Sequence, residues 1–271
     1  MGTISNKRLN LLINSDSKKL DIGSAFVEDL RRTVEKVNMN TSLPSPTYKP
    51  SSMQCIRNSY FQITEVMPDP SKPNPSAVGI AESGSARHEH LQRYVTLMHN
   101  YDIDCEWIDV EKYIQEKNLE DLEVISKTNY ETKLYHKKLN IRFLCDGIIR
   151  YKNEYYIIEF KTEVSNKWMM RKDVASNHVV QACSYSAMFG IDKVLFVYES
   201  RDFCDWKGYV LNITPEMRKE LVLRRIEECN KYIELGKVPP ISKTQSKKMC
   251  NYCSYKLTCK KIGQTEDLFN E

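Results

Sequence analysis

Acidic side chains stand inside apolar, strand-like runs at two places in this chain. Asp146 interrupts the run Phe143–Ile149, and Glu159 and Lys161 interrupt the run that begins at Ile157. Moving an unpaired carboxylate from water into such a strand is costly, so these carboxylates are usually neutralised by a partner or bind a metal. The placement therefore predicts a metal site.

Strand geometry indicates how the site could form. Glu159 and Lys161 are two residues apart, so they point the same way, about 7 Å apart along the strand. A tight turn at Lys152-Asn153 would pair this strand with the one that bears Asp146. Two carboxylates and an ammonium could then share one site, and the oxygen ligands favour magnesium or manganese. The spacing alone is equally consistent with a strand-end acid and a solvated Glu/Lys pair.

The chain has 271 residues, of which 41% are hydrophobic, enough to bury a full core. Periodicity predicts helices over 24–37, 82–98, 106–125, 179–189 and 215–235, and strands over 129–136, 139–151, 154–162, 193–198 and 208–213. We expect an α/β fold with three parts, namely an N-terminal helical appendage (1–50), a core (51–238) and a cysteine-rich tail (239–271).

Composition limits the cellular compartment and the kinds of partner that we expect. No apolar run approaches the ~20 residues needed to span a bilayer, and the first residues lack the apolar core of a secretion signal. We therefore expect a cytoplasmic protein with no membrane partner. Nine cysteines would be reduced there, so a cluster of them favours metal binding over disulfides. The net charge of +4 permits a polyanionic partner without requiring one.

Helical positions supply further polar candidates. His88 lies four residues after Gly84 on one predicted helix, and Gln181 and Tyr185 share a face of another because they are four residues apart. Taken separately, each is more often an ordinary core or helix-surface residue than a functional one. Their order along the chain is more specific.

With Asp146 and the segment Glu159-Phe160-Lys161, these residues follow the order and spacing of a known family. The chain resembles the RecB-like branch of the PD-(D/E)XK nuclease superfamily from about Cys55 to Cys259. The resemblance implies a restriction-endonuclease-like core with a mixed central sheet flanked by helices. It also implies that Asp146, Glu159 and the main-chain carbonyl of Phe160 bind the catalytic metals, and that Lys161 orients or activates the attacking water.

The same resemblance gives roles to four residues elsewhere. It implies that His88 completes the metal shell and that Gln181 and Tyr185 line the site near the DNA. Glu131, in the strand before Asp146, sits where related nucleases often carry an additional acid.

The tail contains three cysteines in a C-x2-C-x5-C pattern, Cys250, Cys253 and Cys259. Three thiolates need a fourth, and Cys55 is the best candidate because it heads the first helix of the core. A distant first cysteine with a terminal trio resembles the iron–sulfur subset of the same branch, which includes AddB-type and CRISPR-associated adaptation nucleases. That resemblance implies a [4Fe–4S] cluster. Zinc, which also accepts four thiolates, is the alternative.

Two basic stretches could contact DNA. In the tail, lysines alternate with tyrosines, whose rings can stack on unpaired bases. The other stretch lies between the Glu159 strand and the Gln181 helix. A charged run is more often only a solvated surface. The candidate DNA-contacting residues are Lys247, Lys248, Tyr252, Tyr255, Lys167, Arg171 and Lys172.

We therefore expect a magnesium- or manganese-dependent DNA exonuclease that acts on DNA ends, with single strands as the favoured substrate, in recombination, replication or DNA processing. One alternative is a DNA-binding or assembly subunit of a larger end-processing machine with weak or no catalysis. Another is a zinc-stabilised endonuclease. The sequence lacks a nucleotide-binding G-x-x-x-x-G-K-[ST] loop, so we expect the protein to work alone or with separately encoded recombination or processing proteins. A phage-encoded protein would work in the host cytoplasm.

Overall fold

A computed structural model describes residues 22–39, 44–242 and 247–269 of the chain. It has two compact units, one formed by Met1–Thr41 and Ser71–Glu82 and the other by Ser42–Pro70 and Ser83–Glu271. Among the described residues, no helix is both long enough and apolar enough to cross a membrane. All the candidate site residues belong to the second unit.

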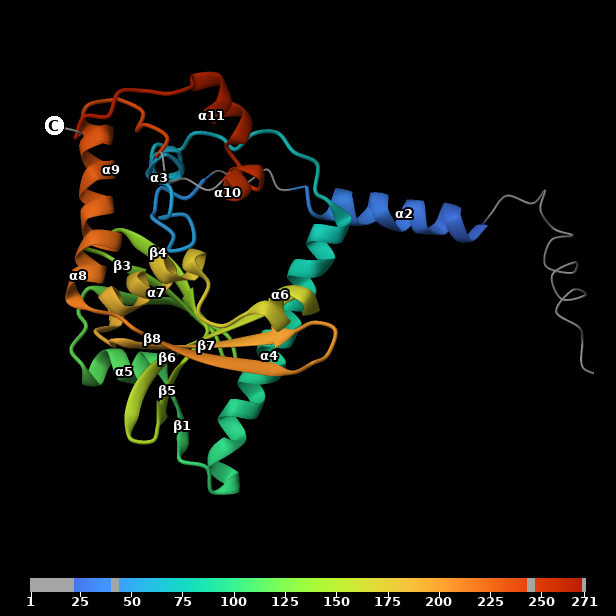
Figure 1. The fold of residues 1–271 in the computed structure, drawn as a ribbon, viewed down its shortest axis with the longest axis vertical. Helices are drawn as coiled ribbons and strands as arrows, with labels where there is room; N and C mark the ends of the chain where they lie inside the picture. The colour runs from blue at the N-terminus through green and yellow to red at the C-terminus, as the bar shows by residue number, and fades with distance from the viewer. Residues whose placement is uncertain (1–21, 40–43, 243–246, 270–271) are drawn as a thin grey trace, which may run out of the picture. The chain divides into compact units, whose positions relative to one another are not determined.

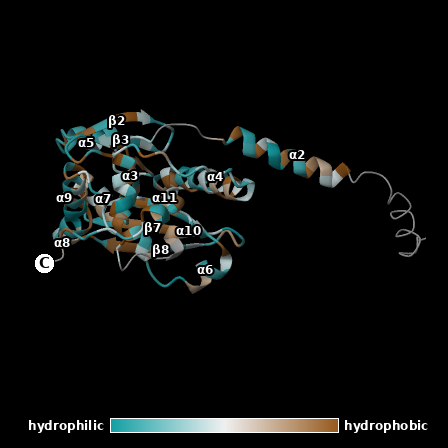
Figure 2. Ribbon diagram, turned by 90° about the horizontal axis from the view of Figure 1, so that it is seen from above, coloured by the Kyte–Doolittle hydropathy of each residue, from teal (hydrophilic) through white to brown (hydrophobic). Residues whose placement is uncertain are grey.

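The first unit contains helix α2 (Ile22–Val37) and the beginning of α4 (Pro75–Leu97). The predicted helix over 24–37 is therefore confirmed. Hydrophobic and hydrophilic residues alternate along the turns of α2 (Figure 2), as expected of an amphipathic helix. Its charged face is paired internally, with Glu28 contacting Arg31 and Arg32. A separate appendage over residues 1–50 remains a prediction, and residues 1–21 lie outside the described part.

The second unit is built on two sheets (Figure 1). The larger has the order β1 (Cys105–Ile108), β5 (Ile148–Tyr151), β6 (Glu154–Glu163), β7 (Lys193–Ser200) and β8 (Trp206–Asn212). It is mixed, because β6 and β7 run parallel while the other neighbours are antiparallel. The smaller is an antiparallel sheet of β2 (Leu122–Lys127), β3 (Thr132–His136) and β4 (Ile141–Cys145).

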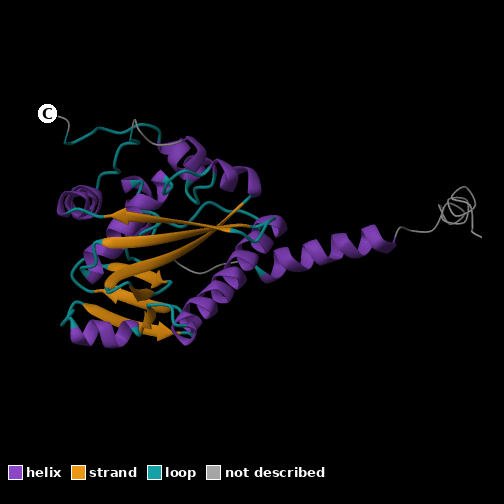
Figure 3. Ribbon diagram, turned by 60° about the horizontal axis from the view of Figure 1, so that its bottom comes forward, coloured by secondary structure: helices purple, strands orange, loops and turns teal. Residues whose placement is uncertain are grey.

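Figure 3 shows these strands in the interior of the unit with helices outside them. The remaining helical segments are α3 (Ile56–Ile63), the 3-10 turn Met98–Tyr101, α5 (Val110–Glu116), α6 (Ser165–Met170), α7 (Ser176–Phe189), α8 (Pro215–Arg218), the π-helical turn Lys219–Leu223, α9 (Arg224–Glu234), α10 (Lys247–Asn251) and α11 (Lys256–Ile262). The helix predicted over 215–235 is confirmed as α8, the π turn and α9. The hydroxyl of Thr214 caps its start by accepting from the amide of Met217.

The strand predicted over 139–151 is wrong in one respect, because it breaks at Asp146-Gly147 into β4 and β5, which belong to different sheets. Gly147 explains the break. A Cβ added there would lie 2.3 Å from Cη2 of Trp107, so the indole ring occupies the space of a side chain. Asp146 is thereby placed at the junction of the two sheets.

The helix predicted over 106–125 is also wrong. Only the central part is helical, as α5, whose start is capped by Asp109 accepting from the amide of Lys112. The flanking residues form β1 and β2, which pair with β5 and β3. The ladder hydrogen bonds of β1 come from a distant strand, and β2 forms a hairpin with the next strand, β3. Strand pairing of this kind overrides local propensity.

Alternation along β6 separates two apolar layers. Ile157 packs in the larger core cluster, which includes residues of α7, whereas Ile158 and Phe160 pack with Leu91 of α4 in the smaller one. Glu159 and Lys161 lie on the α7 side of the strand, since Gln181 of α7 contacts Glu159. The site therefore forms where β6, α7 and the sheet junction meet.

Candidate active site

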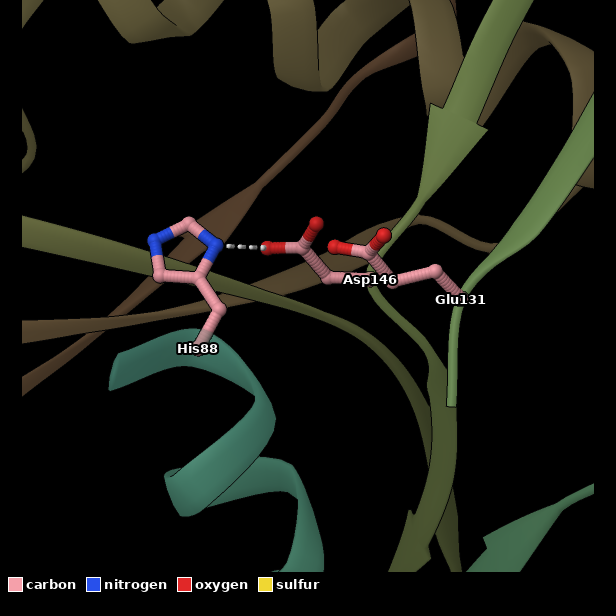
Figure 4. A group of neighbouring side chains, drawn as sticks. All are labelled: His88, Glu131 and Asp146. Carbon is pink, nitrogen blue, oxygen red and sulfur yellow. Dashed lines mark ion pairs between the residues drawn. The ribbon is translucent and has the colours of Figure 1, made fainter. Parts of the chain in front are cut away.

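Three side chains with metal-binding atoms converge at the sheet junction. One atom each of His88, Glu131 and Asp146 lies within 4.8 Å of the other two. Figure 4 shows the three pointing toward one another, His88 from α4 and the two acids from the neighbouring strand ends. The pairing of Thr132 with Cys145 across β3 and β4 explains the arrangement, because it puts the preceding Glu131 opposite the following Asp146.

Asp146 is held at two points. Its Oδ2 accepts a 3.0 Å hydrogen bond from the amide of Phe160, and its main-chain oxygen accepts one of 2.8 Å from Nε2 of Gln92. Nδ1 of His88 lies 3.7 Å from the same Oδ2. Burial raises the pKa of the Asp146 carboxyl to about 6, although the Lys161 ammonium and the amide of Phe160 act in the opposite direction.

Glu159 is only 2% exposed. Its Oε1 accepts hydrogen bonds from Nζ of Lys161 and, at 2.9 Å, from Nε2 of Gln181. Its Oε2 is buried without a hydrogen-bond partner among the residues described. Burial raises the pKa of this carboxyl to about 7, and the nearby Asp146 raises it further. A buried carboxylate oxygen with an open coordination position fits a cation.

Lys161 supplies the positive charge of the site. Burial alone would lower the pKa of its ammonium, but the carboxylates of Glu159 and Asp146 outweigh burial, and the pKa is raised. The side chain is therefore a cation rather than a free amine. It suits charge stabilisation and orientation better than proton abstraction.

Burial shifts the pKa of the two remaining ligand candidates, His88 and Glu131. Burial, followed by the Lys161 charge, lowers the pKa of His88, so its imidazole is neutral and can bind a metal through nitrogen. Burial, followed by Glu159 and Glu89, raises the pKa of Glu131. Three carboxylates and one imidazole form a donor set rich in oxygen, which fits magnesium or manganese.

Gln181 and Tyr185 lie behind Glu159. Nε2 of Gln181 also donates to the Tyr185 hydroxyl at 2.7 Å, and that hydroxyl donates to the main-chain oxygen of Leu144 at 3.2 Å. Tyr185 is buried, and burial raises the pKa of its phenol strongly. Gln181 thus orients the Glu159 carboxylate directly, and Tyr185 does so through Gln181. A direct contact of Tyr185 with DNA stays a prediction.

Gln92 is a site residue that sequence reasoning missed. It is buried on α4 one turn after His88, so both side chains face Asp146. The available signal was its spacing of four residues from His88 on a helix that packs against the sheet.

In the basic stretch after β6, Lys167 and Arg171 form ion pairs with Glu163. Arg171 forms two 2.6 Å hydrogen bonds with that buried carboxylate, and Nζ of Lys167 lies 2.6 Å from it. The guanidinium of Arg171 also stacks over Tyr198 at 4.2 Å. Of the three residues predicted to contact phosphates in this stretch, Lys167 and Lys172 are exposed and Arg171 is half-buried.

The structure brings cysteines of the tail to the start of α3. Cys55 immediately precedes that helix, and its thiol is close enough to Cys253 and Cys259 for their charges to act on it. Burial, more than these neighbours, raises the pKa of Cys55. Cys250 lies on α10, where its main-chain oxygen accepts from the amide of Cys253. All four thiols are partly buried.

Several donors point at these sulfurs. Sγ of Cys253 accepts from Nδ2 of Asn58 and from the amide of Tyr255, both at 3.4 Å, and Sγ of Cys259 accepts from Arg57 at 3.5 Å. Hydrogen bonds to sulfur are typical of metal-bound thiolates. The proximity of Cys55, Cys253 and Cys259, with hydrogen-bond donors at two of their sulfurs, fits a thiolate-held metal site.

The tail is also fixed by Asp69. Its carboxylate accepts from the amides of Leu257 and Thr258 at the start of α11 and, at 2.6 Å, from the Thr258 hydroxyl. The amide of Asp69 in turn donates to the main-chain oxygen of Ser254 at 2.8 Å. A single loop residue thus clamps the start of α11.

The tail residues predicted to contact DNA differ in accessibility. Tyr252 is 86% exposed, whereas Tyr255 is 2% exposed and packs against Phe61 with ring centroids 5.2 Å apart. A stacking contact therefore depends on Tyr252. Lys247 and Lys248 begin α10, but their side chains lie outside the described part of the structure.

No family model matches this chain, and no curated protein is a significant match. Solved structures similar to it include that of SSO0001, with 19% identity, a TM-score of 0.46 and coverage of 87% of this chain and 96% of the other. LHK-Exo in complex with dAMP has 11% identity and a TM-score of 0.41, covering 70% and 89%. The alkaline exonuclease LHK-Exo from Laribacter hongkongensis has 12% identity and a TM-score of 0.36, covering 76% and 93%.

Proposed function

We propose that this protein is a metal-dependent deoxyribonuclease, a phosphodiester hydrolase that acts on DNA ends. The proposal rests on one observation, the convergence of His88, Glu131 and Asp146 near Glu159. Oε2 of Glu159 has no hydrogen-bond partner among the described residues. The buried carboxylates of Asp146 and Glu159 and the half-buried carboxylate of Glu131 repel one another, so the site is electrostatically unfavourable unless protons or cations occupy it. A site of this kind is expected of metal-assisted hydrolysis.

The residues of the site would have different roles in hydrolysis. Asp146, Glu159, Glu131 and His88 would hold magnesium or manganese, and the main-chain carbonyl of Phe160 is a further ligand in the proposal. The bound ion would supply positive charge where negative charge develops on the phosphate. Lys161, held by Glu159, orients the attacking water and offsets the same developing charge. Gln181 keeps the Glu159 carboxylate in place.

We further propose that the substrate is a single-stranded end and that cleavage is exonucleolytic. The exposed ring of Tyr252 can stack on an unpaired base, and the lysines of the tail and Lys172 can neutralise phosphates. Stacking of this kind requires an unpaired base, which favours single strands over duplex.

For the thiols, we propose a [4Fe–4S] cluster held by Cys55, Cys250, Cys253 and Cys259, with a structural role. Its support is the proximity of Cys55, Cys253 and Cys259 and the hydrogen bonds to Cys253 and Cys259 described above. Zinc in the same position is distinguished by metal analysis and by colour, since only the cluster absorbs visible light.

The function is tested with purified protein and two single-stranded DNA substrates, a linear one labelled at either end and an internally labelled circle. Each is incubated with magnesium, manganese or a chelator. We expect metal-dependent release of label from linear DNA and none from circles. Glu159→Ala should abolish cleavage, and Glu154→Gln, at the exposed start of the same strand, should not. Cleavage of circles would show an endonuclease, and binding without cleavage at any metal concentration would show a DNA-binding subunit.

A further inference from the structure

Arg57 is a fully buried arginine next to the thiol site. It is 1% exposed, lies on α3 two residues after Cys55, and is among the largest side chains so enclosed. Its Nε donates to the main-chain oxygen of Pro239 at 2.6 Å, Nη1 to that of Gly263 at 2.7 Å, and Nη2 to Oγ1 of Thr265 at 2.9 Å.

These three acceptors are neutral. Within the described part of the chain, no carboxylate forms an ion pair with Arg57, although several other buried or half-buried arginines have one, such as Arg171 with Glu163. Burying a charge without a counter-charge is costly even when its hydrogen bonds are satisfied. The position therefore calls for an anion.

One contact of Arg57 can supply that anion. Nη1 lies 3.5 Å from Sγ of Cys259, a group that becomes negative when it binds a metal. Two neutral donors, Asn58 and the amide of Tyr255, point at the other nearby sulfur, Cys253. Among the described residues, Arg57 is thus the charged donor to these two sulfurs.

We infer that Arg57 is the built-in counter-charge of an anionic metal–thiolate centre, and that it sets the metal retention and reduction potential of that centre. The inference rests on the proposed cluster and deepens it. Four thiolates outweigh the positive charge of a zinc ion or of a four-iron core, so the centre is a net anion. The guanidinium offsets part of that charge from inside the protein, where screening by water is weak.

The guanidinium of Arg57 is a planar fork of N–H donors, and its hydrogen bonds hold the positive charge in a fixed position. Its acceptors come from both ends of the cysteine tail, Pro239 before the trio and Gly263 and Thr265 after it. A planar five-donor group can satisfy all of them while facing the sulfur, and an ammonium cannot. Arg57 therefore holds its charge beside the sulfur and also links the two ends of the tail.

The test compares Arg57→Lys with Arg57→Gln in full-length protein purified without oxygen. Both variants lose the fork, but only the lysine keeps the charge. Iron and zinc per chain, visible absorbance and resistance to a chelator are measured, with a redox titration where iron is present. We expect the glutamine variant to lose most of its metal and the lysine variant to keep most of it. Any cluster left in the glutamine variant should reduce at a lower potential, by about 59 mV for each tenfold change in the one-electron equilibrium.

Thr265→Val is the matched control, because it removes one acceptor of Arg57 and no charge, and it should keep the wild-type metal content and potential. Equal metal content and potential in the lysine and glutamine variants, whether both full or both empty, would overturn the inference. Wild-type protein that holds neither iron nor zinc would overturn the cluster and the inference together. The nuclease proposal is judged separately, by Glu159→Ala and metal-dependent cleavage.

Discussion

The ammonium of Lys161 donates a hydrogen bond to Oε1 of Glu159, and both side chains project from the same face of β6. One carboxylate oxygen is thereby occupied by a fixed cation, and the other is left for a ligand. A Glu-x-Lys pair in a strand thus produces a site with adjacent positive and negative positions. This relationship underlies the first two predictions.

Replacing Lys161 by glutamine should abolish cleavage while DNA binding and the fold persist. Glutamine keeps a polar, hydrogen-bonding side chain but not the charge that offsets the developing phosphate charge. Activity, binding of labelled single-stranded DNA and the melting temperature report the three properties. Lys152→Gln, at the β5–β6 turn, is the control that should leave all three unchanged. Full activity in the Lys161 variant would contradict its assigned role.

Stability should depend on pH in a metal-sensitive way. The folded protein raises the pKa of Asp146 from 3.8 to about 6 and that of Glu159 from 4.5 to about 7. Because the folded state then binds protons more tightly than the unfolded state, these groups favour folding most at low pH. In a chelator, their contribution should be lost progressively as pH rises from about 4 to about 7.

Magnesium should reverse this trend, because it replaces the protons on the same carboxylates. Thermal melts across this pH range, with chelator or with magnesium, provide the measurement. The midpoint of the pH–activity curve should also move to lower pH as magnesium increases. Identical melting profiles with and without magnesium would contradict a metal site at these carboxylates.

Gln92→Ala should weaken metal binding more than it weakens catalysis at saturating metal. Its amide holds the main-chain oxygen of Asp146, and loss of such a supporting contact typically costs about 10–100-fold in metal affinity. The magnesium concentration for half-maximal cleavage should rise accordingly. Gln115→Ala, on the exposed side of α5, is the control. A change in maximal rate with an unchanged magnesium requirement would argue against a positioning role.

Gly147→Ala should destabilise the protein by about 1–3 kcal/mol, the usual cost of forcing an atom into a packed core. The new Cβ would collide with the Trp107 ring. Denaturant unfolding measures the loss, and adding Trp107→Leu should recover part of it. Gly79→Ala meets nothing within 4 Å on a helix and should be neutral or stabilising. If the Gly147 variant were as stable as wild type, the packing explanation for the strand break would be wrong.

Tyr252→Ala should lower affinity for single-stranded DNA by about 1–3 kcal/mol, the range for loss of one stacked base. Binding is best measured with Glu159→Gln protein in a chelator, so that no cleavage interferes. Tyr101→Ala removes a comparably exposed ring, 74% against 86%, from outside the tail and should have no effect. Equal affinities for the two variants would remove Tyr252 from the DNA surface.

The elements with a strong local pattern could be predicted from the sequence. The strand over 154–162 and the helix over 179–189 correspond to β6 and α7, because alternation and helical apolar spacing are local properties. The Lys152-Asn153 turn is confirmed by left-handed backbone angles at both residues, with φ of 48° and 68°. The Glu159–Lys161 contact followed from the same alternation.

Features that depend on long-range contact could not be predicted in this way. The approach of Glu131 to Asp146 requires the β3–β4 register, and the role of Gln92 requires α4 to pack against the sheet junction. Tyr255 looked like an exposed aromatic residue in a basic tail, but docking of the tail on Phe61 buries it. In each case the partner lies far away in the sequence.

The hydrogen bonds of Asp69 to the start of α11 affect how the tail would behave if the proposed metal were lost. Because this carboxylate grips the first turn of α11 without using any thiol, chelation or oxidation need not release the C-terminal segment. If the proposed metal were lost, Cys253 and Cys259 would therefore stay near Cys55. Reassembly of the proposed centre could then proceed without unfolding of the protein around it.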